Sequence, residues 1–165
     1  MSEEKEYERL AIALGMASFQ AQALEHSLVS LYASTFVLNK GKWDIEVREL
    51  MDTRYNQTLG RLIRDATKEL NIPSDLEVEL ENALKERNWV THHFFREYGA
   101  VGMSQKLLQE ATNKLEDLWP CFEKVASEVS ELAIQRRIQS GFTREQVNSN
   151  IERALGLYVN ERENT

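Results

Sequence analysis

Cysteine, proline and glycine are all scarce in this chain of 165 residues, and each scarcity excludes something. Cys121 is the single cysteine, so no disulfide can form within the chain, and a reducing compartment such as the cytoplasm is favoured. Only two prolines and seven glycines are present. Because these residues interrupt helices, their scarcity leaves room for long uninterrupted helices.

Long apolar runs and an excess of basic residues are also absent. No apolar stretch approaches the roughly 18 residues that a membrane-spanning helix needs. The first residues, MSEEKEYERL, are acidic and lack the basic-then-apolar pattern of a secretory signal. We therefore expect a cytoplasmic protein with no membrane partner. The net charge of −7 argues against a protein that coats DNA or RNA through many phosphate contacts, and we expect no DNA partner; a small local site for nucleic acid is still compatible with it.

The apolar residues recur with a helical period along most of the chain. In the first segment, from about Glu4 to Leu38, the spacing alternates between four and three, which predicts a helix that packs nearly parallel to other helices. Similar patterns predict helices over about 56–70, from Leu76 to about 96, and over 105–139, with a short helix or turn at 43–53. The line of small or apolar residues in the first segment consists of Leu10, Leu14, Ala17, Ala21, Leu24, Leu28, Leu31 and Leu38, with Thr35 completing the series.

The residues between these segments are typical of helix ends. Ser74 or Asp75 can cap the third helix, and Ser104, after a loop at 97–104, can cap the fourth. The sequence TREQ at 143–146 is a capping box that begins a last helix. No strand-like alternation competes with the helical pattern. We predict an all-α, up-and-down helical bundle of four main helices in residues 1–140, with a C-terminal helical extension at 141–165.

One stretch of the third helix, LKERNWVTHHFFREY at 84–98, combines polar and aromatic residues in an unusual way. Arg87 is a charged residue on the apolar line of this helix. Asn88 and His92 are four residues apart, so they are neighbours on the helix surface and an amide–imidazole hydrogen bond is feasible. Arg87 can reach the same region, whereas His93 projects to another side. Arg87, Asn88 and His92 are therefore the candidate site residues.

Plainer interpretations of the same residues exist. Arg87 can be a structural residue that pairs with an acid such as Glu25, Glu46 or Asp52. His93 and Glu97 are four residues apart, but no further ligand completes a metal site, so we expect no metal and no cofactor. The remaining candidate, the cysteine beside Pro120, has no visible partner base and is interpreted as a packing residue.

The sequence Arg87-Asn88-Trp89-Val90-Thr91-His92 resembles the signature of the HEPN superfamily of small helical bundles. In that signature an Arg, often followed by Asn, precedes a His by four to six residues on a late helix of the bundle. Many members are toxins or antiviral effectors with metal-independent endoribonuclease activity, and others only bind nucleotides or RNA. Their sites are usually composite, because two bundles dimerise and bring two Arg-His pairs together.

The resemblance implies a role for each residue. Arg87 would stabilise negative charge on a phosphate, His92 would act as general acid or base, and Asn88 would position the reacting groups. It also implies a homodimer and RNA or a nucleotide as ligand, and it allows an antitoxin protein as partner. One toxin branch carries a Tyr two residues after the His that can be adenylylated; here that place is Phe94, which has no hydroxyl.

Two other functions are compatible with the same pattern. One is a non-catalytic HEPN-like bundle that binds nucleotides, RNA or another protein, and the other is a helical adaptor in which Arg87 is structural. The acidic net charge favours these two, whereas the intact Arg-Asn-His set favours the ribonuclease.

Overall fold

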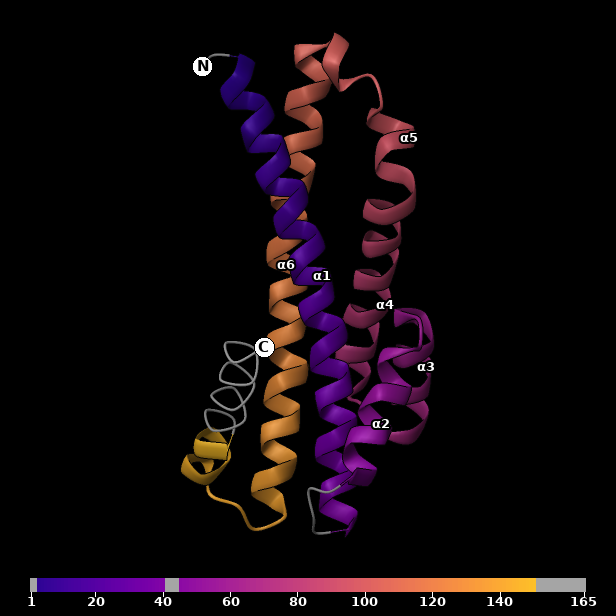
Figure 1. Ribbon diagram of the computed structural model, residues 1–165, viewed down its shortest axis with the longest axis vertical. Coiled ribbons are helices and arrows are strands. Elements are labelled where there is room, and N and C mark those ends of the chain that lie inside the picture. The colour runs from indigo at the N-terminus through magenta and orange to yellow at the C-terminus, as the bar shows by residue number, and fades with distance from the viewer. Residues whose placement is uncertain (1–2, 41–44, 151–165) are drawn as a thin grey trace.

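Every regular element of the chain is a helix in the computed structural model, which describes residues 3–40 and 45–150. This confirms the predicted all-α class and the helical bundle. The two longest helices are α1 (Glu3–Lys40) and α6 (Gln105–Gln139). They lie side by side and cross each other once (Figure 1). None of the described helices is both long and apolar enough to cross a membrane.

The long pair runs in the same direction, because Arg9 near the start of α1 pairs with Glu116 in the first half of α6. Between them come α2 (Ile45–Tyr55), α3 (Leu59–Glu69) and α4 (Ser74–Asn88). The two short helices α2 and α3 pack beside the lower half of α1, and α4 rises past them (Figure 1). The element expected as a short helix or turn is thus an 11-residue helix.

The helix that begins as α4 is longer than its own bounds. It continues through a π-helical segment, η1 (Trp89–His93), into α5 (Phe94–Tyr98), and these three elements form one rod beside α1 and α6 (Figure 1). A 3₁₀ turn, η2 (Val101–Met103), then leads into α6. A β-carbon at Gly99 would lie 2.6 Å from the Phe95 carbonyl oxygen, which explains why glycine follows α5.

The apolar lines predicted from the sequence form the core. Almost all their described members are buried, including Leu24 and Leu28 of α1, Leu62 of α3 and Leu115 of α6. On α4 and the segments that follow it, the buried positions repeat the predicted line except at Arg87: Leu76, Leu80, Ala83, Val90 and Phe94.

The helix ends agree with the predicted caps except at α4. The Ser104 hydroxyl accepts a hydrogen bond from the Leu107 N–H at 3.4 Å, as expected for the N-cap of α6. The capping box is also confirmed, since the backbone N–H groups of Thr143 and Gln146 each donate to the other's side chain. At α4 the prediction was wrong: Pro73 occupies the N-cap position, and no side chain caps the helix.

Cys121 also differs from its interpretation as a packing residue. It lies exposed on α6, and its thiol donates a hydrogen bond to the backbone carbonyl of Asp117 at 3.4 Å. The position follows directly from the helical period, because the buried line of α6 passes through the next residue, Phe122.

The groove between α1 and η1 as a candidate functional site

The backbone changes from α-helical to π-helical at the predicted motif. The N–H of Phe94 bonds to the carbonyl of Trp89, five residues earlier, so one turn of the rod is π-helical. Such turns hold one more residue than an α-helical turn, and they occur often at functional sites. Val90 and Phe94 are both buried, whereas Thr91, His92 and His93 between them are exposed. The π-helical segment thus carries a run of polar side chains on its solvent side.

Arg87, the charged residue on the apolar line, lies at the edge of a groove between α1 and η1. The groove has a volume of about 280 Å³ and combines an apolar floor with polar walls. Residues of α1 form one wall, and residues of α4 and η1 form the other. The lining consists of Ser18, Ala21, Gln22, Glu25, Arg87, Val90 and Thr91.

The guanidinium of Arg87 has two side-chain partners. Its Nη2 donates to Glu25 Oε1 at 3.1 Å, and its Nη1 donates to Asn88 Oδ1 at 3.4 Å. Glu25 is one of the three acids that the sequence offered as partners for Arg87. Both members of the ion pair keep partial contact with solvent, since 28% of the Arg87 side chain and 29% of the Glu25 side chain are exposed. The charge of Arg87 is therefore balanced, but it is still accessible from the groove.

His92 lies in the row of residues next to Arg87. Asn88, His92 and Arg96 are spaced four apart, so they follow one another along the rod in the order of successive turns. The imidazole is exposed and makes no hydrogen bond to another residue in the part of the chain that the structure describes. The hydrogen bond between Asn88 and His92 that the spacing allows is not formed, and the Asn88 side-chain oxygen accepts from Arg87.

A second row, parallel to the first, starts at Arg87 itself. The Thr91 hydroxyl donates to the Arg87 carbonyl at 2.9 Å, and Phe95 lies one turn further along. The two rows together form a strip, which we call the motif strip: Arg87, Asn88, Thr91, His92, Phe95 and Arg96. The strip carries two cations, an imidazole, an amide, a hydroxyl and an aromatic ring on one surface.

The π turn is fastened from behind by α6. The Lys114 ammonium lies 3.5 Å from the centre of the Trp89 ring, a cation–π contact, and 3.7 Å from the Glu97 carboxylate. The Trp89 ring also meets the rings of Phe94 and Tyr98 edge-on, at centroid distances of 5.8 and 6.1 Å. The backbone that carries His92 is thus anchored by a cluster of aromatic residues on the side away from solvent.

No metal centre is evident at the motif. The pair His93 and Glu97 gains no further ligand, because Glu97 faces Lys114. Within residues 3–40 and 45–150, no group of three or more His, Cys, Asp or Glu side chains is arranged to hold a metal ion.

Another polar cluster joins α1 to α2 and was not predicted. His26 Nδ1 is hydrogen-bonded to the Tyr55 hydroxyl, the two rings are stacked at 6.0 Å, and Ser30 Oγ lies 3.5 Å from His26 Nε2. Spacing reveals only the i, i+4 pair of His26 and Ser30, since Tyr55 is 29 residues away along the chain. Because its hydrogen bond and ring stacking join α1 to α2, we interpret this cluster as a contact between the two helices.

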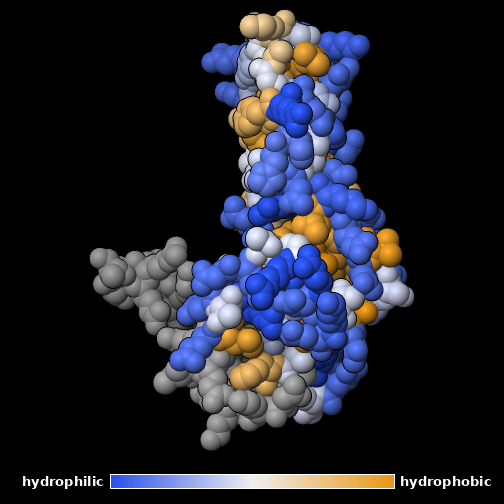
Figure 2. Space-filling view, turned by 90° about the vertical axis from the view of Figure 1, so that its right-hand side faces the viewer, coloured by the Kyte–Doolittle hydropathy of each residue, from blue (hydrophilic) through white to orange (hydrophobic). Residues whose placement is uncertain are grey.

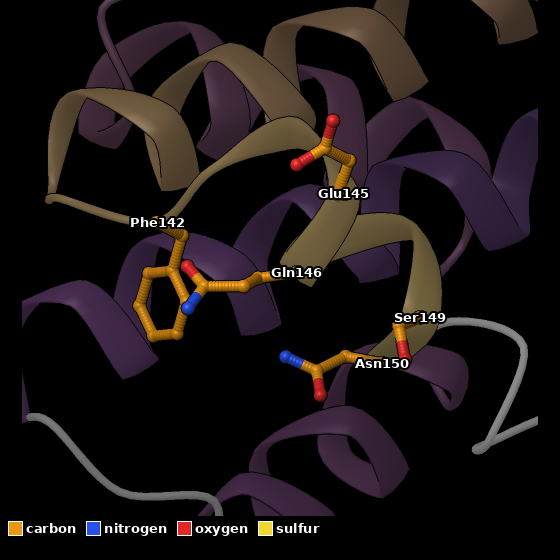
Figure 3. Close-up of a pocket in the computed structure, with 5 residues that line it drawn as sticks. All are labelled: Phe142, Glu145, Gln146, Ser149 and Asn150. Atoms are coloured by element: carbon orange, nitrogen blue, oxygen red, sulfur yellow. The ribbon is translucent and has the colours of Figure 1, made fainter.

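A second hollow, of about 430 Å³, lies at the start of the last helix. The side chains of Phe142 and Gln146 lie close together, and Asn150 points toward them (Figure 3). Its described lining contains neither a cation nor a histidine, unlike the groove at Arg87. We therefore place the candidate functional site at the motif strip.

Comparisons of the chain with models of protein families, with curated proteins and with solved structures give no match. The functional argument consequently rests on the residues of the motif strip and the groove beside it.

Proposed function

We propose that the protein is a metal-independent endoribonuclease of the HEPN type, acting in toxin–antitoxin or antiviral defence. The observation that carries the proposal is the position of Arg87, Asn88 and His92. Arg87 lines the groove, Asn88 and His92 lie in the adjacent row of the rod, and the His92 imidazole is exposed to solvent.

The chemistry requires little beyond these groups. RNA carries its own nucleophile, the 2′-hydroxyl, which attacks the neighbouring phosphorus as the bond to the 5′-oxygen breaks. His92 takes the proton from the 2′-hydroxyl or gives one to the leaving 5′-oxygen. Arg87 stabilises the additional negative charge on the phosphate in the transition state, and Asn88 holds a phosphate oxygen or orients the groups. The products are a 2′,3′-cyclic phosphate and a 5′-hydroxyl.

We further propose that the active form is a homodimer. One chain offers one Arg87–His92 pair, which supplies either the acid or the base, whereas concerted cleavage uses both. A symmetric dimer that brings two motif strips together would supply two histidines in one cleft. Light scattering tests this, since a protein that stays monomeric at micromolar concentration would contradict a composite site. The proposal includes a cytoplasmic location, which the single cysteine favours. It also includes neutralisation by an antitoxin protein.

The test of catalysis is substitution of the two principal residues. His92→Ala should abolish RNA cleavage, and Arg87→Ala should lower the rate about 100-fold, the effect of removing one donor to a developing charge. His93→Ala is the matched control: it removes the adjacent exposed imidazole and should have little effect. Cleavage should continue in EDTA. Purified protein that cuts no RNA, or that depends on His93 more than on His92, would rule out this assignment.

A second candidate function is non-catalytic binding of RNA or a nucleotide. The ion pair between Arg87 and Glu25 favours it. The Glu25 carboxylate opposes the additional negative charge that the phosphate would gain in the transition state of cleavage, whereas binding alone adds no such charge. Binding that depends on Arg87 without any cleavage would support this candidate over the ribonuclease.

A further inference from the structure

We infer that Phe95 and Arg96 bind an unpaired nucleotide of the substrate, with its base stacked on the Phe95 ring and its phosphate on the Arg96 guanidinium. This inference rests on the proposed function and extends it, because it assigns the residues that select the substrate. Both side chains lie one turn beyond the reacting groups: Phe95 follows Thr91 in the row of Arg87, and Arg96 follows His92.

Phe95 is the aromatic residue of the motif strip that faces solvent. Its side chain is 72% exposed, although Phe94 beside it is fully buried. The two rings meet edge-on, with centroids 5.0 Å apart and planes at 81°. Phe94 therefore supports the exposed ring from the core side without covering it. A supported, solvent-facing ring is the arrangement on which bases of single-stranded nucleic acid stack.

The surroundings of Phe95 do not favour a protein partner instead. The face of the molecule that carries α3, α4 and α5 is mostly hydrophilic, with small, separate hydrophobic patches (Figure 2). Specific protein interfaces need a much larger continuous surface with an apolar centre. A single exposed ring next to an arginine in the sequence fits a base better than it fits an apolar protein surface.

Arg96 differs from most of the arginines whose side chains the structure describes. It is exposed and makes no hydrogen bond or ion pair with any residue in the described parts of the chain. The arginines that do pair with a carboxylate are Arg9, Arg54, Arg61, Arg87 and Arg144. Arg96 thus keeps its full charge available for a phosphate next to His92.

The arrangement selects single-stranded RNA. A base in a duplex has its faces covered by its neighbours, so it cannot stack on Phe95 unless it leaves the helix. An unpaired base has a free face, and stacking on an aromatic side chain contributes about 1–3 kcal/mol per base. The Arg96–phosphate contact places the same nucleotide within one helical turn of His92. The nucleotide that the protein recognises therefore lies directly beside the bond that is cleaved.

Binding can be measured without cleavage in the His92→Ala protein. We would titrate it with a fluorescently labelled single-stranded RNA and with the same RNA in a duplex, and follow anisotropy. Single-stranded RNA should bind more tightly than the duplex. Replacing Phe95 by Leu should weaken single-strand binding about tenfold, the lower part of the range for losing one stacked base. Phe95→Trp should preserve binding, because it keeps an aromatic face.

Two further variants separate the phosphate contact from general charge. Arg96→Gln should weaken binding severalfold and make it less sensitive to salt, since one phosphate contact is lost. Lys106→Gln removes an exposed cation outside the motif strip and should have little effect. Phe19→Leu removes an exposed aromatic ring on α1, as the control for Phe95→Leu, and should also have little effect. Equal binding by Phe95→Leu and the parent, or equal binding of duplex and single strand, would overturn the inference.

The outcomes also separate this inference from the proposed function. If the unmodified protein binds single-stranded RNA through Phe95 but never cuts it, the ribonuclease is wrong and the binding site stands. If it cuts RNA and Phe95→Leu leaves kcat/KM unchanged, the ribonuclease stands and the binding site is wrong. If it binds no RNA, both are wrong.

Discussion

Two regions of the molecule each contain a partly buried arginine. One is the corner between α1, α2 and α3, and the other is the groove between α1 and η1. The two arginines have very different surroundings. Arg54 at the corner is 14% exposed and is satisfied on several sides. It donates to Asp65 at 3.2 Å and to Glu69 at 2.9 Å, and its guanidinium lies 3.9 Å from the centre of the Tyr32 ring. Burial raises the pKa of that tyrosine strongly, so the ring remains neutral under the cation.

Arg87 has half as many charged partners and twice the exposure. It faces one carboxylate, Glu25, and one amide, Asn88, at the edge of an open groove. A guanidinium has five N–H donors, so Arg87 keeps donors that a phosphate can use. The comparison teaches that a partly buried arginine on an apolar line is a functional candidate only when its partners leave it accessible.

The largest effect we expect from breaking this comparison is on stability. Arg54→Ala removes two ion pairs and a cation–π contact at the corner, so it should lower the free energy of unfolding by about 2 kcal/mol. Arg87→Ala removes one partly exposed pair and should cost about 1 kcal/mol or less. Urea denaturation of the two variants measures the difference directly, with Arg64→Ala, an exposed arginine of α3, as the control. Equal losses for Arg54 and Arg87 would show that both are structural.

A smaller effect should follow when the charge that balances Arg87 is removed. Glu25→Gln keeps the size of the side chain but leaves the guanidinium without a counter-charge, so single-stranded RNA should bind about fivefold more tightly, equivalent to roughly 1 kcal/mol. Glu116→Gln makes the same change in net charge at the ion pair with Arg9, on the α6 side of α1. If both variants improve binding equally, the gain reflects overall charge and not the groove.

The smallest effect on stability should come from an exposed ion pair, that between Arg144 and Glu131. The hydrogen bond from Arg144, and next that from Gln135, lowers the pKa of Glu131. Because the folded-state pKa is depressed, this pair contributes stability above the ordinary glutamate pKa and loses it as the pH falls through the folded value. Arg144→Gln should raise the pKa of Glu131, as followed by NMR. It should also weaken the protein slightly at neutral pH and have no effect in strong acid; a loss that persists in acid would indicate packing instead.

The sequence predicted the helices well because their determinants are local. The spacing of Leu59, Leu62 and Ile63 specifies the buried face of α3, and Ser104 specifies the start of α6, without reference to the rest of the chain. Errors arose where local rules are permissive. Pro73 is compatible with the N-cap region as well as with a loop, and Cys121 next to a buried position has no polarity that excludes the core.

The candidate site was predicted only in part. The identity of Arg87, Asn88 and His92 follows from the motif, but the contact between Arg87 and Glu25 joins residues 62 positions apart, and spacing offered three acids equally. The π turn has no sequence code of its own; the closest signal is the run from Trp89 to Phe95, whose residues are all weak helix formers. The exposed fractions of Arg87 and Phe95, and the absence of a partner for Arg96 among the described residues, likewise required the structure.

The parallel pairing of α1 and α6 has a consequence for how the chain acquires its fold. Contacts along this pair join residues about a hundred positions apart, as between Arg9 and Glu116, Ser27 and Ser130, and Thr35 and Arg136. During synthesis the apolar line of α1 therefore leaves the ribosome long before the helix that covers it. The shorter helices and the rod of the motif strip can cover only part of that line in the meantime. The groove beside Arg87 is lined by α1, α4 and η1 alone, but Lys114 of α6 packs on Trp89 at the start of the π-helical segment. A chain truncated before α6 should therefore lose the support of the segment that carries His92.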